Sequence, residues 1–276
     1  MKKAIFLILM SISIFSCEKV DSNSDKRFVT ANYYINDSFI GKTDYIYDDS
    51  SGLLKSETTR IYGNRYVKNL YAYSSDSISV NQAIYNGTDS IHNQIIIFTS
   101  SDKRLVTRIK TYNQENLILT SDRRYSFDLS YHLLQTDYFT GLQLFDFNYN
   151  LNNISNYKLL FPRILPPYGN DTIQVSANYL TYQNQAGINN FLLVNMFNLI
   201  SSDFQTMNLE LAGCTFSTAD NLLNSLHFLP NTLPDHTYQY TFDSKQRVNT
   251  KTLDYVSPVE LPPNQLYKVE YIYPSE

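Results

Sequence analysis

Apolar and polar side chains alternate with a period of two along much of the chain after residue 27. In residues 125–133, aromatic and aliphatic side chains take every second position, with Ser, Asp and His between them. Residues 145–150, 238–242 and 267–273 repeat this alternation with Tyr, Phe and Val. Such alternation is typical of antiparallel strands that bury one face and expose the other to water. The pattern therefore predicts a mostly β protein.

Short polar segments rich in Asp, Asn and Ser separate the alternating segments. Gly52 and Gly87 lie in two of them, where glycine can adopt the positive φ that tight turns need. Asn86-Gly87 is the strongest hairpin signal in the chain. We therefore expect successive strands to be joined by short turns, at residues 48–52, 74–77, 86–89, 100–103, 150–153 and 243–246.

The segment "YIYDDSSGLL" at 45–54 combines two tyrosines, an acidic turn and an aliphatic return strand. Weaker copies are "FNYNLNNIS" at 147–155 and "YTFDSKQRV" at 240–248. The pattern resembles the Tyr-Asp hairpins of YD-repeat proteins, and more closely a family of Bacteroidetes-type lipoproteins whose domain has no assigned function. The resemblance implies a large, curved antiparallel sheet, an open or partial barrel, over residues 28–276. It supplies no catalytic residues.

Two segments depart from the alternation. In the first, Ser217 can cap a helix, Pro230 can end it, and leucines recur between them at helical spacing. We therefore expect a helix over residues 218–228. The second segment, residues 191–200, is nearly all apolar and could be strand or helix.

A curved sheet with an aromatic concave face needs a cover, because large exposed apolar patches are rare on soluble proteins. We expect the apolar segments at 191–200 and 218–228 to fill that face as a plug. In the alternative, the concave face is open and available to a ligand. The plug residues would be Leu192, Val194, Phe197, Leu222, Leu223 and Leu226.

Proline-rich segments at 160–172 and 257–265 are expected to be long loops, because proline cannot donate a hydrogen bond within a sheet. No segment after residue 27 has the length or composition of an interdomain linker. We therefore expect one domain over residues 28–276.

The first 27 residues have the composition of a lipoprotein leader. A basic start and an apolar run at 4–15 form a signal peptide that is too short to span a bilayer. The run ends in Ser16-Cys17, which resembles a bacterial lipobox. We expect residues 1–16 to be removed, Cys17 to be lipidated and 17–27 to form a polar tether. Glu18, which is not Asp, favours the outer membrane and leaves the side of that membrane open.

Charge is low and carries no basic stripe. Charged residues make up 17% of the chain, and 22 Lys and Arg face 26 Asp and Glu. Because phosphate backbones are bound through clustered positive charge, nucleic acid is not an expected partner.

No catalytic or metal-binding motif is present in the sequence, and we expect neither a cofactor nor a metal. Cys214 lies in an apolar setting and is expected to be a buried structural residue. A set of Cys214, His227 and Asp235 can be assembled by residue type alone. His227 and His236 could equally be considered as a metal pair, although their spacing matches no zinc site.

These observations favour a non-catalytic, lipid-anchored envelope protein that binds or scaffolds an unknown protein or glycan. The alternatives are a lipoprotein hydrolase with an unrecognised site and a surface lipoprotein that captures glycans or peptides. The chain has 24 Tyr and 16 Phe but no Trp, which weakens the glycan alternative because Trp is the largest stacking ring. A membrane-spanning barrel is disfavoured, because several apolar runs are short and interrupted by acids.

Overall fold

The structure is a computed structural model. It describes residues 27–61, 65–100, 105–138, 143–162, 170–183, 188, 211–214, 220–229, 235–256 and 265–274. The predicted signal peptide, Cys17 and the tether up to residue 26 lie outside these residues. No helix in the described part of the chain is long and apolar enough to cross a membrane.

The described residues form sixteen antiparallel strands and no helix. In chain order the strands are β1 (Thr30–Ile35), β2 (Ser38–Tyr47), β3 (Leu54–Ile61), β4 (Arg65–Tyr73), β5 (Ser77–Asn86), β6 (Asp89–Thr99), β7 (Val106–Asn113), β8 (Leu119–Phe127), β9 (Leu133–Tyr138), β10 (Gln143–Asn150), β11 (Asn153–Pro162), β12 (Asn170–Gln183), β13 (Asn221–Leu229), β14 (Asp235–Phe242), β15 (Val248–Val256) and β16 (Gln265–Ile272).

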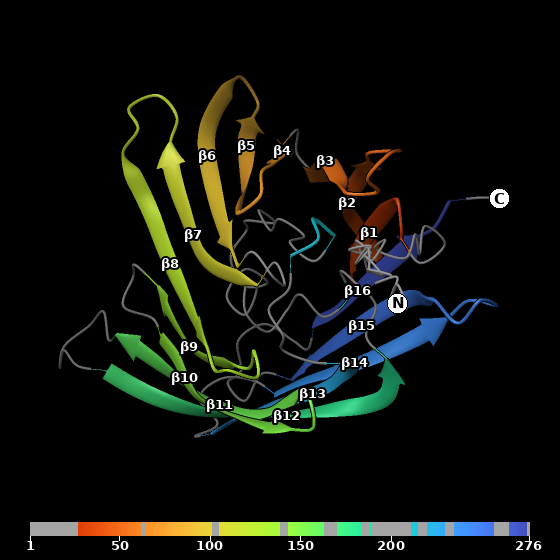
Figure 1. The fold of residues 1–276 in the computed structure, drawn as a ribbon. Coiled ribbons are helices and arrows are strands. Elements are labelled where there is room, and N and C mark those ends of the chain that lie inside the picture. Colours follow the sequence, from red (N-terminus) through yellow and green to blue (C-terminus); the bar gives the residue numbers. More distant parts are fainter. Residues whose placement is uncertain are drawn as a thin grey trace, which may run out of the picture.

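Each strand pairs with the next one in the sequence, and β16 pairs with β1, so the sheet closes into a barrel (Figure 1). The closing ladder runs from Thr30, opposite Ile272, to Ile35, opposite Tyr267. The expected open or partial barrel is therefore wrong. Closure leaves no edge strand with unpaired backbone groups, which explains why this sheet does not stay open.

The predicted turns are confirmed at the hairpins that the structure describes in full. Gly87 has a φ of 65° in the two-residue loop between β5 and β6. In the turn after β2, the Asp48 carboxylate accepts hydrogen bonds from the backbone N–H groups of Ser50 and Ser51, at 3.1 and 2.8 Å. These bonds, with those from the serine hydroxyls, lower the pKa of Asp48. Asp and Ser thus act here as turn formers.

The helix expected at 218–228 is absent, and β13 occupies this segment. A register shift against β12 places Leu223 opposite Tyr179 and Leu226 opposite Ala177, so both leucines face the interior. A spacing of three is typical of a helix, and here an irregularity in the strand produces it. Leu222, Leu223 and Leu226 are fully buried, but they belong to the barrel wall, and plugging helices are not supported.

The barrel interior holds the hydrophobic core. Its largest fully buried side chains include Phe28, Tyr157, Phe228 and Tyr238. The same core includes four residues from the connection between β12 and β13: Ile188, Leu211, Ala212 and Cys214. The predicted plug residues at 191–200, among them Leu192, Val194 and Phe197, lie outside the described residues.

Most of the predicted aromatic faces are confirmed, with one correction at a turn and one within a strand. Tyr125 and Tyr271 lie in the core, and Tyr240 and Phe242 pack against it. β8 ends at Phe127, so Leu129 is fully exposed in the turn that follows.

The second correction concerns β10. Phe145 pairs with Lys158 and faces outward, whereas Phe147 stacks on the buried Tyr157 with ring centroids 5.3 Å apart. The irregularity between them includes Asp146, whose φ is 53°. An extra residue in a strand reverses the alternation of faces, and the period-two pattern could not show this.

Candidate functional site

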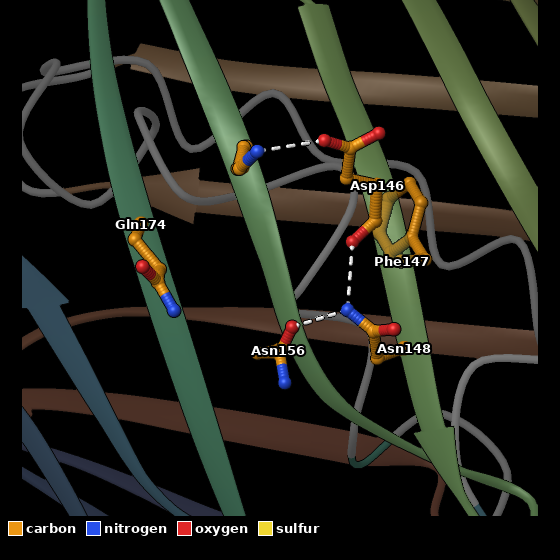
Figure 2. Close-up of a pocket in the computed structure, with 6 residues that line it drawn as sticks. Asp146, Phe147, Asn148, Asn156 and Gln174 are labelled. Carbon is orange, nitrogen blue, oxygen red and sulfur yellow. Dashed lines mark hydrogen bonds and ion pairs between the residues drawn. The ribbon is translucent and has the colours of Figure 1, made fainter.

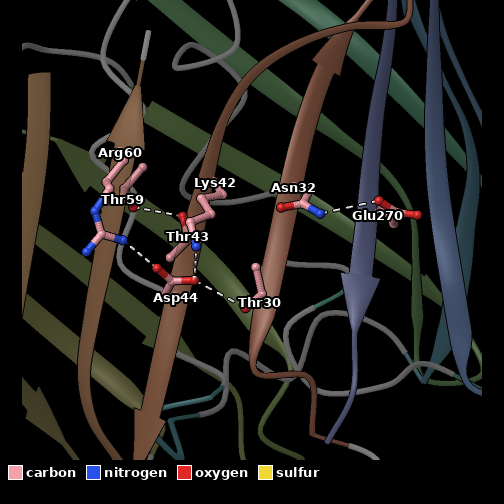
Figure 3. A network of polar contacts seen from close by, with 8 residues as sticks. All are labelled: Thr30, Asn32, Lys42, Thr43, Asp44, Thr59, Arg60 and Glu270. Atoms are coloured by element: carbon pink, nitrogen blue, oxygen red, sulfur yellow. Dashed lines mark hydrogen bonds and ion pairs between the residues drawn. The ribbon is translucent and has the colours of Figure 1, made fainter. Parts of the chain in front are cut away.

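The outer face of the barrel carries charged side chains in the middle of its strands. On β2, Asp44 accepts hydrogen bonds from Thr30 of β1 at 3.2 Å and from Lys42 at 3.0 Å, and it also pairs with Arg60 of β3 (Figure 3). Desolvation alone would raise the pKa of Asp44, but the bonds from Lys42 and Arg60 outweigh it and lower that pKa. This network is outside the wall.

Similar pairs occur elsewhere around the outer face. Arg108 of β7 binds Asp122 of β8 through two bonds, from Nε at 2.8 Å and from Nη2 at 2.5 Å. The outward-facing charged residues, placed by strand register, are Lys42, Asp44, Arg60, Lys68, Arg108, Lys110, Asp122, Arg124, Asp137, Asp146, Lys158, Asp254, Lys268 and Glu270. Exposed apolar residues such as Ile46 and Leu70 lie among them. The outer face therefore carries charged side chains around much of the barrel, together with single exposed apolar ones.

The inner face also has buried polar groups, and these are tied into the core. Glu57 of β3 is 1% exposed and accepts hydrogen bonds from Asn69 and Tyr71, both at 2.7 Å. Burial first, and then the charge of Glu57, raise the pKa of Tyr71. Lys251 of β15 donates to the Ile188 carbonyl at 2.8 Å and so fixes that residue inside the barrel. These contacts hold the interior together.

A pocket of about 380 Å³ lies on the outer face across β10, β11 and β12. Lys158 donates to the Asp146 carboxylate at 2.8 Å, and the Asn148 amide donates to the Asn156 side chain at 2.5 Å (Figure 2). Gln174 of β12 lines the opposite side of the pocket. Because carboxamides both donate and accept hydrogen bonds, this lining suits a neutral polar ligand with hydroxyl or amide groups.

The structure brings together two members of the set that sequence composition suggested. His227 Nδ1 lies 2.9 Å from Asp235 Oδ2, and both side chains are about half exposed on the outer face. Cys214 is 4% exposed and belongs to the core, so it lies on the other side of the wall. The Cys214–His227–Asp235 set is therefore not assembled.

His227 has a second neighbour, Ser225, which the sequence analysis did not identify as a site residue. Ser225 Oγ lies 3.2 Å from His227 Nε2 and accepts a hydrogen bond from the Asn178 amide at 3.1 Å. The signal was Ser-x-His, which puts both residues on one face of a strand. It was hidden because the segment was expected to be a helix.

His236 is separated from His227 by the barrel wall. It pairs with Leu226 and packs edge-on against Phe228, with ring centroids 5.2 Å apart, whereas His227 faces outward. Burial lowers the pKa of His236 to about 4, although the charge of Asp235 opposes this shift. The two histidines therefore cannot share a metal ion as one site.

The fold defines a class, the wide next-neighbour antiparallel barrel, and a solved structure shares it. The chain is similar to the crystal structure of a porin-like protein from Bacteroides uniformis, with a TM-score of 0.60 and 13% identity, over 90% of this chain and 98% of that chain. A crystal structure of a porin-like protein from Bacteroides vulgatus matches over 90% of this chain and 98% of that chain, with a TM-score of 0.42 and 9% identity. No family model and no curated protein matches the chain. At these identities, the first likeness establishes the fold alone.

Proposed function

We propose that the protein is a lipid-anchored cell-envelope protein whose barrel stands in water and binds a polar ligand on its outer face. The anchor is the lipid on Cys17, and the outer membrane is its location. The ligand is a glycan or a peptide. The observation that carries the proposal is the distribution of side chains, with charge outside the wall and the apolar core within it.

A membrane-spanning barrel has the opposite distribution. It presents an apolar band about 25 Å tall to lipid, and an Arg or Lys at the centre of that band destabilises the protein by about 2–4 kcal/mol. Arg60, Arg108 and Lys158 all lie on the outer face within strands. Strand length does not decide the matter, because β2, β5 and β11 each have 10 residues and could span a bilayer. The charges do.

The packed interior also supports a role other than conduction. Barrels of sixteen strands are wide enough to leave an aqueous channel. Here the inward-facing Leu54, Ile97 and Val175 of three different strands are fully buried. Leu211, Ala212 and Cys214 belong to the same core. We therefore place ligand binding on the outer face.

The outer pocket indicates the ligand class. Asn148, Asn156 and Gln174 supply amides that can donate to and accept from hydroxyl or peptide groups, and the Lys158–Asp146 pair keeps the net charge of the lining near zero. A neutral saccharide or a peptide backbone fits these groups better than an anion does.

Carbonate extraction of membranes tests the anchor and the surroundings of the barrel together. Wild-type protein should stay with the membrane. Cys17→Ala, made with residues 1–16 exchanged for a leader that is cleaved without lipidation, should be released as a folded protein without detergent. Cys214→Ala, which leaves the lipidation site intact, is the matched control and should stay with the membrane. If Cys17→Ala also stays in the extracted membrane, the barrel itself is embedded and the proposal is wrong.

Thermal-shift screening against a panel of neutral oligosaccharides and peptides tests the ligand site. A ligand should raise the melting temperature of the wild type and of Gln239→Ala, which changes an exposed residue on β14 that does not line the pocket. The same ligand should lose that effect on Asn156→Ala. If the ligand raises the melting temperatures of Asn156→Ala and the wild type equally, the pocket is not the ligand site.

A further inference from the structure

Three side chains on the outer face of β13 and β14 form a continuous hydrogen-bonded chain. Ser225 Oγ is 3.2 Å from His227 Nε2, and His227 Nδ1 is 2.9 Å from Asp235 Oδ2. The Asp235 carboxylate also accepts the backbone N–H of Phe228 at 3.2 Å. Each ring nitrogen of the imidazole thus has one partner, a hydroxyl on one side and a carboxylate on the other.

The strand pairing produces this arrangement. Ser225 and His227 are two residues apart on β13, so their side chains point to the same face. The ladder pairs Ser225 with Thr237 and Leu226 with His236, and continuing it by one residue places Asp235 opposite His227. The three groups are therefore held by regular β geometry on a closed barrel.

We propose that Ser225, His227 and Asp235 form a hydrolytic site for carboxylic esters. Ser225 is the nucleophile, His227 is the general base and acid, and Asp235 is a positioning residue that orients the imidazole. The proposal takes up the hydrolase alternative that the sequence left open, with Ser225 where residue types alone had suggested Cys214.

The hydrogen-bond partners fix the direction of proton transfer. An ionised carboxylate can only accept, so Asp235 selects the tautomer with the proton on Nδ1 and leaves Nε2 free to accept the serine proton. Burial alone would raise the pKa of Asp235, but the hydrogen bonds from His227 and Phe228 outweigh it and lower that pKa. Asp235 is therefore ionised at neutral pH.

The reaction proceeds in two balanced steps. Ser225 Oγ attacks the ester carbonyl carbon while its proton moves to His227 Nε2, which then protonates the departing alcohol as the ester C–O bond breaks. In the second step, the same nitrogen deprotonates a water molecule, which attacks the acyl carbon. The C–O bond to Ser225 breaks, the carboxylic acid is released, and His227 returns the proton to Ser225 Oγ. The net change is ester plus water to acid plus alcohol.

Asn178 is placed to stabilise the charge that develops on the carbonyl oxygen. Its amide donates to Ser225 Oγ at 3.1 Å in the resting state. When Oγ bonds to the substrate carbon, the new oxyanion lies two bonds away from Oγ, so a small movement of the Asn178 side chain lets its amide donate to that oxygen instead. Ser225 is 6% exposed, whereas the His227 side chain next to it is about half exposed, so water reaches the site from the side of the imidazole. Such an open site excludes little water, so we expect slow turnover.

The nearby pocket suggests the kind of ester. Asn156 of β11 pairs with Ser176 of β12, and Ser176 pairs with His227. Neighbouring strands are about 4.8 Å apart, so the pocket edge lies about 10 Å from the imidazole on the same face. An acylated saccharide can place its ester at Ser225 and its hydroxyl groups at the pocket. This substrate class rests on the proposed ligand pocket, whereas the activated serine does not.

Labelling the purified full-length chain with a fluorophosphonate tests the activated serine. This probe phosphonylates a serine hydroxyl that a base has activated. We expect an adduct on Ser225, read by peptide mass spectrometry, and at least about a hundred-fold slower labelling of His227→Ala. Ser79→Ala, which changes a serine on the outer face of β5, should label like the wild type. No adduct on Ser225 of the folded chain, or a rate that His227→Ala leaves unchanged, would overturn the proposal.

The positioning role of Asp235 needs a readout that a structural role would not move. Asp235→Asn keeps the size of the side chain but favours the other tautomer, so we expect the labelling rate to fall about a hundred-fold or more. Asp235→Glu should restore a large part of the rate. Equal rates for Asp235→Asn and the wild type would contradict this role.

Monoacetylated maltose, which keeps free hydroxyl groups, and p-nitrophenyl acetate, which has none, together separate catalysis from ligand binding. Hydrolysis of both esters should be lost in Ser225→Ala. Asn156→Ala should raise the KM for monoacetylated maltose by a larger factor than the KM for p-nitrophenyl acetate, because only the saccharide has hydroxyl groups for the pocket. If Asn156→Ala changes neither KM nor labelling, the saccharide class is wrong and the activated serine stands.

Discussion

Two regions of the barrel differ in the regularity of their strand pairing. From β4 to β6 the ladders run without a register shift over nine pairs and then ten pairs. From β10 to β13 the pairing shifts beside Asn148, and again beside Asn178 and Tyr179. The outer pocket and the Ser225–His227–Asp235 site lie in or next to this second region. Irregular strands re-aim side chains, and they are frequent beside functional sites.

The comparison shows where an antiparallel barrel can place polar chemistry. In the regular region, alternation sends apolar residues such as Val80 and Ile84 inward and leaves the outer face as a solvated surface. In the irregular region, the shift at Asp146 turns Phe145 outward and opens the pocket. The shift beside Asn178 places an amide next to Ser225.

The largest expected effect tests whether the irregular region is packed as tightly as the regular one. Leu226→Ala in β13 and Ile97→Ala in β6 both remove fully buried side chains. Each should lower the free energy of unfolding by about 2–5 kcal/mol in urea titrations. Leu229→Ala, at a 53% exposed position on β13, is the control and should change it little. A small effect for Leu226→Ala alone would show that β13 is loosely packed.

A pH effect at His236 is the next largest. Its pKa is about 4 in the folded protein and 6.5 when unfolded, so the unfolded state binds the proton more readily. Stability is therefore unaffected above pH 6.5 and falls as pH drops from 6.5 to 4, by up to about 3 kcal/mol. Urea midpoints across this range should show the loss in the wild type and much less of it in His236→Leu. Parallel pH curves for the two proteins would exclude His236 as the cause.

A smaller effect tests the irregularity in β10. Asp146 has a φ of 53°, a conformation that β-branched residues adopt only with strain. Asp146→Val should therefore destabilise the protein by about 1–2 kcal/mol, whereas Asp146→Asn should be close to neutral. Thermal denaturation measures both variants. Equal stability would mean that the irregularity is not fixed at this residue.

The smallest effect concerns the regular part of the outer face. Asp122 accepts two bonds from Arg108 and is 13% exposed. Asp122→Asn should lower stability by about 0.5–1 kcal/mol at low salt, and less at high salt, as surface ion pairs do. A loss of several kcal/mol that does not depend on salt concentration would show that this ion pair is shielded from water.

The sequence predicts the class of the fold well because alternation and turn chemistry are local. The hairpins, the inward Tyr125 and the burial of Leu223 and Leu226 all follow from short patterns. Closure could not be predicted, because it depends on pairing between β1 and β16, whose Asn32 and Glu270 are 238 positions apart.

The candidate site could be predicted only in part, for two physical reasons. Leu223 and Leu226 mimic a helix because a strand irregularity lies between them, and on a helix Ser225 and His227 would point apart. Asp235 was considered by residue type, but its contact with His227 requires the pairing of β13 with β14. Cys17 and its lipidation remain a sequence prediction.

The most direct test of the account is whether water or lipid surrounds the barrel wall. Single cysteines at Asn81, Arg124 and Gln239, exposed outward positions on β5, β8 and β14, can be introduced with Cys214→Ala. A water-soluble maleimide should then modify all three in intact membrane fragments as fast as in protein released by Cys17→Ala. Strong protection of these positions in the membrane alone would show that lipid covers the outer face, and would contradict the account.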